Sequence, residues 1–199
     1  MDHLRDREKQ IVNLLTDDPR LTVNDIAEHL GVSVVTARTD LDGLAEQGYI
    51  VRVHGGALPA FHPDIVARQK ERTETKKRLA RRAAEMVDSG DSIMIESGTT
   101  TALIARYLLG KSNIRVVTDS TLLLPYARTN PALSMVFVGG TFRPETESNV
   151  GPMTIQELSH FHVKYAFLGT DGLSIDRGLT TDSIEAAQVS RTMAEQADT

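Results

Sequence analysis

The sequence predicts an α/β protein in which a small helical head precedes an open, mostly parallel sheet. In residues 1–60, apolar side chains recur at helical spacing and short turns interrupt them. From Asp91 onward, short apolar runs alternate with helical segments instead. Strands that alternate with helices favour a parallel sheet covered on both faces. A chain of 199 residues is long enough for two such domains.

The composition is that of a folded protein, with 40% hydrophobic and 25% charged residues. The sequence has no cysteine, which excludes disulfides, thiolate nucleophiles and zinc–thiolate sites. No apolar run approaches the ~20 residues of a membrane helix, and no signal peptide is evident, so we expect a cytoplasmic protein without membrane contact. The net charge of −5 lends no support to nucleic-acid binding, which therefore has to rest on local geometry.

The first sixty residues predict three helices followed by a short β-ribbon. A first helix spans about residues 5–16, Thr22 caps a second, and Ser33 caps a third that ends near Gly48. The β-branched residues of the segment 49–58, which surround a pair of glycines, predict the ribbon. Two helices joined by a short glycine-containing turn are the parts of a helix-turn-helix.

The third helix presents the surface that would read DNA. If Ala37, Leu41 and Leu44 face the core, then Val35 and Thr39 point away from it, at about 100° per residue. The first two turns of such a helix enter the major groove, and the ribbon acts as a wing. The candidate DNA contacts are Thr22, Ser33, Val35, Thr36, Arg38, Thr39, Arg52 and His54. The pattern alone also fits a helical module that docks onto another protein.

The second half of the chain follows a proline-containing stretch. We expect a DNA-binding domain over residues 1–58, a linker over 59–72 and a ligand-binding domain over 73–199. The first helix of this last domain has an expected apolar face formed by Leu79, Ala83, Met86 and Val87. Its cluster of lysines and arginines predicts a solvated face with ion pairs from Glu74 to Arg78 and from Arg81 to Glu85. The expected strands are 92–95, 115–118, 135–138 and 165–168, and the other expected helices are 99–109, 121–128, 153–161 and 183–199.

Hydroxyl side chains and a glycine follow the first predicted strand, where they would open a helix. Unpaired N–H groups and the positive end of the helix dipole favour an anion at such a place. Two further motifs, residues 138–143 and 168–172, lie at the ends of the third and fourth predicted strands. Ligands of parallel sheets bind outside the carboxyl ends of the strands. Arg143 would pair with a phosphate and Asp171 would accept hydrogen bonds from sugar hydroxyls. The candidate ligand contacts are Ser97, Gly98, Thr99, Thr100, Thr101, Gly139, Gly140, Arg143, Asp171 and Gly172.

Each of these motifs also has a purely structural interpretation. Serine and threonine commonly cap a helix after a strand, and glycine pairs commonly make tight turns. The expectation that three motifs meet at one edge of the sheet favours a binding site over three separate turns. His160 and His162 lack a third ligand, so we expect no metal ion and no organic cofactor.

Several runs in the first sixty residues match one protein family. The run from Leu21 to Ala27, the turn Gly31-Val32-Ser33, the pair Asp40-Leu41 and the run from His54 to Ala57 resemble the N-terminal region of DeoR-family transcriptional regulators. The resemblance spans nearly all of residues 5–58 and implies a winged helix-turn-helix joined to a sugar-phosphate sensor. Thr39 stands where this family usually has a second arginine, which implies about one phosphate contact fewer.

The resemblance continues in the second half. The segments 97–101, 139–144, 150–152, 166–172 and 178–181 look like the sensor domain of that family, which is similar in fold to ribose-5-phosphate isomerase. The resemblance implies that these loops bind a phosphorylated sugar effector. The family usually has Val-Lys-Arg where this chain has Val189-Ser190-Arg191, and it usually continues with a further strand. We therefore expect a sheet that is short of its last strand.

The leading hypothesis is a DNA-binding transcriptional regulator, a repressor of a carbohydrate-utilisation operon. It would bind a double-stranded DNA operator as a homo-oligomer, a dimer or a tetramer, under the control of a phosphorylated sugar. An effector that prefers one conformation of the sensor would change the spacing of the paired heads.

The alternative is a sugar-phosphate isomerase with an added helical head. Such an enzyme needs a positioned carboxylate base, for which Glu96, Asp171 and Glu185 are candidates. The resemblance implies two aspartates around a glycine in an isomerase-like loop, but the segment 169–172 keeps one, and no lysine follows Lys164. We therefore expect no enzymatic activity. A module that only assembles with other proteins is a third interpretation.

Overall fold

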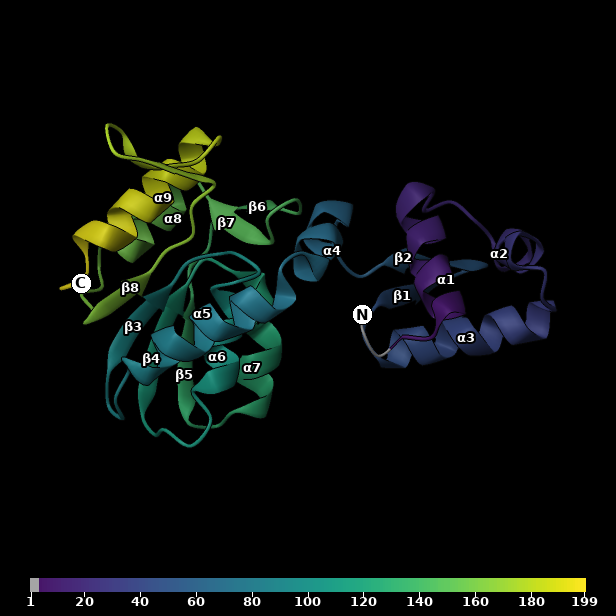
Figure 1. Cartoon of the computed structure of the whole chain (residues 1–199), viewed down its shortest axis with the longest axis horizontal. Helices are drawn as coiled ribbons and strands as arrows, with labels where there is room; N and C mark the ends of the chain where they lie inside the picture. Colours follow the sequence, from purple (N-terminus) through teal and green to yellow (C-terminus); the bar gives the residue numbers. More distant parts are fainter. Residues whose placement is uncertain (1–3) are drawn as a thin grey trace. The chain divides into compact units, whose positions relative to one another are not determined.

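The computed structural model describes residues 4–199, which form two compact units with a boundary between Lys70 and Glu71 (Figure 1). The first three residues of the expected DNA-binding domain lie outside the described part. Each unit has its own hydrophobic core. Within the described part of the chain, no helix is long and apolar enough to cross a lipid bilayer.

The first unit holds the three predicted helices and the predicted ribbon. Its elements are α1 (Asp6–Asp17), α2 (Val23–Leu30), α3 (Val34–Glu46), β1 (Ile50–Val53), β2 (Gly56–Pro59) and α4 (Pro63–Lys70). The start of α2 is set by a capping box, in which Thr22 Oγ1 accepts the N–H of Asp25 and Asp25 Oδ2 accepts the N–H of Thr22. Ser33 Oγ accepts the N–H of Thr36 at 3.1 Å and so caps α3.

The core of this unit comes from one apolar stripe on each helix. Ile11, Leu15, Ile26, Leu41 and Leu44 are fully buried and belong to one cluster. The stripes follow the helical spacing that the sequence shows, so α2 and α3 pack with α1 as the pattern predicts. The helix-turn-helix and its ribbon are therefore confirmed.

A buried ion pair joins the first helix to the third. Asp40 on α3 is 3% exposed, and its Oδ2 lies 2.6 Å from Arg7 Nε while its Oδ1 lies 2.9 Å from Arg7 Nη2. Arg5 adds a contact of 3.2 Å to the same carboxylate. A two-point contact of this kind fixes orientation as well as distance, so it sets how α3 lies on the head.

The segment 59–72, which the sequence predicts to be a linker, contains the helix α4. Proline at the first position of a helix does not break it, so Pro63 marks the beginning of α4. Val66 packs against the core of the first unit, and Lys70 Nζ lies 3.4 Å from Asn13 Oδ1 of α1. This helix therefore belongs to the first unit.

The second unit is built on a parallel sheet with the strand order β5-β4-β3-β8. The strands β3 and β4 pair in parallel from Ser92 opposite Arg115, and β8 pairs in parallel on the other side of β3. The elements are α5 (Thr73–Glu85), β3 (Ser92–Ile95), α6 (Ala102–Tyr107), β4 (Ile114–Thr118), α7 (Leu124–Thr129), β5 (Leu133–Phe137), β6 (Thr141–Arg143), β7 (Ser148–Val150), α8 (Pro152–Leu158), β8 (Tyr165–Phe167), β9 (Gly172–Ser174), β10 (Gly178–Thr180) and α9 (Ile184–Glu195).

Helices cover both faces of this sheet. α5 and α6 lie side by side on one face (Figure 1). On the other face, Met94 and Val117 share a buried cluster with Leu158 of α8 and with Val189 and Met193 of α9. Alternate residues of a strand point to opposite faces, which is why β3 and β4 are almost entirely buried.

The predicted apolar face of α5 is correct only in part, and two hairpins were not predicted. Val87 is fully buried as expected, but Leu79 and Met86 are 58% and 42% exposed, and Ala80 and Ala84 are buried in their place. The small side chains of these alanines let α5 pack closely against α6, so this face is buried although larger apolar residues lie elsewhere on the helix. The hairpins β6–β7 and β9–β10 consist of strands of only three residues, too short for a clear alternating pattern.

The residues after α9 run beside the outer edge of the sheet. Val163 and Ala197 form a parallel bridge, the N–H of Ala166 donates to the carbonyl of Thr199 at 2.9 Å, and the N–H of Thr199 donates to the carbonyl of Lys164. The expected helix to residue 199 thus ends at Glu195, and the final residues extend the hydrogen bonding beyond β8.

Replacing Leu41 with alanine should destabilise the first unit without affecting the second. The side chain is fully buried between the helices, so its removal leaves a cavity that costs about 2–5 kcal/mol. Hydrogen exchange of the amides in α1–α3 measures this loss separately from the sheet. Val35→Ala, at a position 72% exposed, is the matched control and should leave protection unchanged. Equal protection in both variants would contradict the packing described here.

Candidate functional site

The exposed face of α3 is the one that the sequence predicts. Ala37 is fully buried, while Val35, Arg38 and Thr39 are exposed in the first two turns. Among the described residues, the Arg38 side chain has no ion-pair partner. An unpaired guanidinium on the outer face of such a helix can contact either a phosphate or a guanine edge.

Most hydroxyl groups predicted to contact DNA already have local partners. Ser33 Oγ lies 2.8 Å from Thr36 Oγ1 in addition to capping α3, and Thr22 Oγ1 donates to Asp25 at 2.7 Å. Thr39 Oγ1 donates to the carbonyl of Val35 at 3.1 Å. Thr22 and Ser33 therefore position their helices. Val35 and Arg38 are the predicted contacts on α3 that are exposed and make no local side-chain hydrogen bond among the described residues.

The wing is held against both helices of the motif. Val23 donates its N–H to the carbonyl of Gly55 at 3.0 Å, which ties the turn between β1 and β2 to the start of α2. Arg52 Nε lies 3.4 Å from Asp42 Oδ1 on α3, so the charge of the wing arginine is partly neutralised. His54 is exposed beside Gly55, which has a φ of +79° at the tip.

In the second unit, the loops after β3 and β8 meet through a buried carboxylate. Glu96 Oε2 accepts the N–H of Gly169 at 2.6 Å, and the hydroxyl of Ser190 on α9 donates to Oε1. Glu96 is only 6% exposed. Burial raises the pKa of Glu96, and the hydrogen bonds from Ser190 and Gly169 oppose that rise.

A second buried carboxylate, Asp119, holds the loop that follows β3. Its Oδ1 accepts the N–H of Ser97 at 2.8 Å, and its own carbonyl accepts the N–H of Asn149. Burial, together with the nearby charge of Glu96, raises the pKa of Asp119 to about 7. The sequence analysis misses this residue, although it directly follows a predicted strand, as the other candidate motifs do.

The hydroxyl-rich segment after β3 is a turn rather than the first turn of a helix, because α6 begins at Ala102. Thr101 is buried and donates its hydroxyl to the carbonyl of Gly98 at 3.1 Å. Thr99 Oγ1 accepts a hydrogen bond of 2.9 Å from Lys76 Nζ on α5. A lysine therefore reaches the segment for which the sequence predicts a phosphate site.

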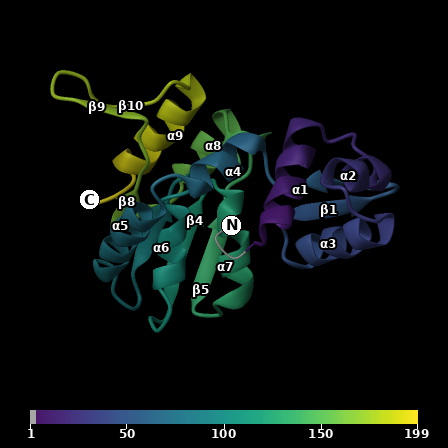
Figure 2. The ribbon, with the colours of Figure 1, turned by 45° about the vertical axis from the view of Figure 1, so that its right-hand side comes forward.

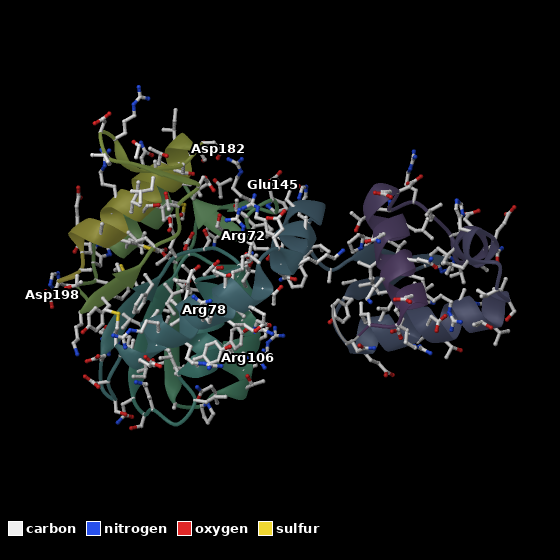
Figure 3. All side chains as sticks on the ribbon, in the orientation of Figure 1. Arg72, Arg78, Arg106, Glu145, Asp182 and Asp198 are labelled. Carbon is white, nitrogen blue, oxygen red and sulfur yellow. The ribbon has the colours of Figure 1, made fainter. Side chains whose placement is uncertain are left out.

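This contact corrects the interpretation of the basic face of α5. The ion pairs seen among the described residues of this helix join Lys77 to Glu74 and Arg82 to Glu85, three residues apart, rather than the pairs predicted. The guanidinium of Arg81 lies 5.4 Å above the ring of Tyr107 on α6. Figure 3 shows the side chains of this face, with Arg78 of α5 and Arg106 of α6 labelled.

The two glycines after β5 pack against α8. The N–H of Gly139 donates to Glu157 Oε2 at 2.7 Å, and its carbonyl accepts from Thr154 Oγ1 at 2.7 Å. Gly140 has a φ of +149°, and a Cβ there would lie 2.0 Å from Thr154 Oγ1. Only glycine fits this contact, so the structure gives the pair a packing role.

The remaining predicted ligand contacts bond to neighbours of their own. Arg143 on β6 lies 3.5 Å from Glu185 and 3.7 Å from Glu145, which is labelled in Figure 3. Asp171 Oδ2 accepts the hydroxyl of Thr181 at 2.7 Å, at the base of the β9–β10 hairpin. Within residues 4–199, hydrogen bonds join the segment 97–101 to Lys76 and Asp119, and none joins it to Arg143 or Asp171.

The carboxyl edge of the sheet thus combines two kinds of groups. The turn after β3 offers hydroxyls and backbone N–H groups beside a lysine, a set that suits phosphate oxygens. Glu96 and Asp119 offer carboxylate oxygens, which accept hydrogen bonds from hydroxyls. No group of three or more histidines, aspartates and glutamates in the described part of the chain is arranged to hold a metal ion.

Comparison with known families covers both units. The DeoR-like helix-turn-helix domain matches residues 7–60, and the DeoR C terminal sensor domain matches residues 71–199. The glycerol-3-phosphate regulon repressor of Escherichia coli is 31% identical over 192 residues, which are 95% of this chain and 76% of that protein.

Two further relatives agree with these matches. The transcriptional regulator GlpR of Haloferax volcanii is 33% identical over 96% of this chain and 76% of its own length. The transcriptional repressor GlcR of Bacillus subtilis is 33% identical over 94% of this chain and 73% of its own length. The chain, with its winged helix-turn-helix head and its parallel-sheet sensor, therefore belongs to the DeoR family of transcriptional regulators.

Proposed function

We propose that this protein represses a carbohydrate-utilisation operon and releases its operator when a phosphorylated sugar binds the sensor. The observation that carries the first half is the outward face of α3, with Val35, Arg38 and Thr39 exposed above a fully buried stripe. Val35 contacts a thymine methyl group and Arg38 a guanine edge or a phosphate. The names of the relatives, repressors of a glycerol-3-phosphate regulon among them, support the second half.

The effector site lies at the turn after β3. The phosphate binds the hydroxyls of Ser97, Thr99 and Thr100 together with Lys76, which is already 2.9 Å from Thr99 Oγ1. The sugar lies beside the loops that Glu96 and Asp119 hold in place by accepting the N–H groups of Gly169 and Ser97. Arg143, Asp171 and Gly172 form the outer rim of the site, on the side of β6 and β9. A similarity of the sensor in fold to ribose-5-phosphate isomerase stays a prediction.

Effector binding acts on the junction between the units by changing the contacts of α5. Lys76 lies in the first turn of this helix, which begins at Thr73, just after the boundary at Lys70 and Glu71. A phosphate that takes over the contact of Lys76 with Thr99 changes the position of the start of α5. Pairs of heads read two half-sites about 34 Å apart, so a small shift at this junction changes whether both heads fit the operator at once.

The sensor binds its ligand without turnover. Isomerisation of a sugar phosphate needs a base that takes a proton from one carbon and a partner that polarises the neighbouring carbonyl. Both oxygens of Glu96 already accept hydrogen bonds, from Gly169 and Ser190, and Asp119 is occupied in holding the turn. Detection of an aldose-to-ketose conversion by the purified protein would contradict this part of the proposal.

Replacing Arg38 with alanine should weaken operator binding about tenfold or more, because one charged contact to DNA is lost. The slope of log K against log salt concentration should fall in magnitude by about 1. A fluorescence anisotropy titration of the upstream region of its own operon measures both quantities at several salt concentrations. Arg128→Ala, at an exposed arginine of the sensor, is the matched control and should bind as the wild type does. Unchanged binding by the Arg38 variant would show that this arginine of α3 does not contact the operator.

Replacing Lys76 with glutamine should weaken effector binding about tenfold, because a charged hydrogen bond to a phosphate is lost. Thermal unfolding with a panel of phosphorylated sugars and their unphosphorylated counterparts identifies the effector, and operator release measures its action. Lys77→Gln is the matched control, since Lys77 pairs with Glu74 instead. If no phosphorylated sugar raises the unfolding temperature of the wild type, the effector class is wrong.

The stability of the sensor should decrease as the pH rises from about 5 to about 7. The pKa of Asp119 is about 7 in the folded protein and near 3.8 in the unfolded chain, so the folded state holds the extra proton in this range. Each pH unit then costs at most about 1.4 kcal/mol, and the dependence ends above pH 7. Asp119→Asn should flatten the dependence, as measured by urea unfolding at pH 5 and 8. Asp171→Asn, at an exposed carboxylate, should not.

A further inference from the structure

The β9–β10 hairpin is the most apolar exposed part of the sensor. Leu173 and Leu179 lie opposite each other in the register of the two strands, and they are 75% and 60% exposed. Ile175 in the connecting turn is fully exposed, and Ile184, at the beginning of α9, is 78% exposed. Figure 2 shows the hairpin reaching out from the side of α9, away from the parallel sheet.

Such a hairpin needs a cover. A two-stranded hairpin alone is marginally stable in water, and an isolated cluster of large apolar side chains on a surface marks a contact with another molecule. The hydrogen bonds that hold this hairpin to the domain lie at its base, where Thr170 Oγ1 donates to the carbonyl of Thr180 and Thr181 Oγ1 donates to Asp171. The tip makes no such contact among the described residues.

The charges at the tip select the partner. Asp176 and Arg177 are adjacent in the turn, both are exposed, and within residues 4–199 neither side chain takes part in an ion pair. In a two-fold symmetric contact, each surface meets its own copy, so Asp176 of one copy faces Arg177 of the other and the reverse. A surface with one charge of each sign next to an apolar centre is therefore complementary to itself.

We propose that the β9–β10 hairpin is the surface through which two copies of this chain pair, with Leu173, Ile175 and Leu179 at the centre of the contact. Ile184 on α9 extends the apolar area, and Asp176 and Arg177 form the charged pairs at its rim. The inference rests on the proposed function in one respect: two reading heads on one operator require paired chains.

Pairing at this surface also involves the effector site. The base of the hairpin is formed by Thr170 and Asp171, which follow β8 at the carboxyl edge of the sheet, and by Thr181, which follows β10. Gly169, the residue before Thr170, donates its N–H to Glu96. A ligand that moves the loop after β8 therefore moves the hairpin, so effector binding alters the geometry of the pair.

The first test measures the mass of the full chain in solution. Analytical ultracentrifugation of the wild type at micromolar concentrations should show a dimer, or a tetramer built from dimers. The double variant Leu173→Ser, Ile175→Ser should raise the dissociation constant of the pair at least tenfold. Leu109→Ser, at a leucine 67% exposed after α6, is the matched control and should pair as the wild type does. A monomeric wild type, or a double variant that still pairs normally, would overturn the proposal.

A charge exchange tests the symmetry of the contact and does not depend on the apolar core. Asp176→Arg and Arg177→Asp should each weaken self-pairing, since like charges then face each other. A mixture of the two variants should pair again, because every arginine then faces an aspartate. If the mixture stays unpaired while both variants keep the wild-type unfolding temperature, the two-fold contact is wrong.

These outcomes are separable from those that test the proposed function. Variants of the hairpin leave Arg38 and Lys76 in place, so a single half-site should still bind them with wild-type affinity and a phosphorylated sugar should still raise their unfolding temperature. If the hairpin variants still pair and the wild type still binds its operator, the regulator stands and the pairing surface lies elsewhere. If pairing is lost as expected but neither DNA nor any sugar phosphate binds the wild type, the surface stands and the proposed function does not.

Discussion

The sensor depends on the contact between the Asp119 carboxylate and the N–H of Ser97. Parallel strands bring their carboxyl ends to one edge of the sheet. Ser97 after β3 and Asp119 after β4 are therefore neighbours in space, although they are 22 positions apart in the sequence. Burial of this carboxylate costs free energy and raises its pKa to about 7, and the hydrogen bond from Ser97 offsets part of that cost. A buried acceptor of this kind fixes the turn from Ser97 to Thr101, and with it the direction of the hydroxyls that this turn carries.

The head shows how an acidic protein can present a surface to DNA. The chain has a net charge of −5, and α3 itself contains Asp40 and Asp42. Asp40 is buried against Arg7 and Arg5, and Asp42 lies beside Arg52 of the wing. Both carboxylates are thereby compensated from inside the protein, so the first two turns of the helix can expose Arg38 to a phosphate backbone. Local pairing, not total charge, decides whether this face tolerates DNA.

The head could be predicted closely from the sequence, because the signals that build it are local. The caps of Thr22 and Ser33 act within three residues, and the buried stripe of α3 follows from helical spacing. The parallel sheet could be predicted equally well from the sequence, since its four strands are short apolar runs. Asp119 and Lys76 were not, because their roles depend on contacts with residues 22 and 23 positions away. The linker was misjudged because a proline at the first position of a helix resembles a proline that prevents one.

The same distinction explains why an exposed hairpin was not anticipated. Leu173, Ile175 and Leu179 look like core residues in the sequence, since apolar side chains in a sheet domain are usually buried. Only the three-dimensional arrangement shows that they stand outside the core, joined to the effector loops by the hydrogen bonds at Thr170 and Asp171. A regulator that must report a small ligand to DNA needs an element that belongs to the ligand site at one end and to a second chain at the other. With the effector site and the pairing surface as proposed, the hairpin meets both requirements, whereas the helices that cover the sheet are committed to its core.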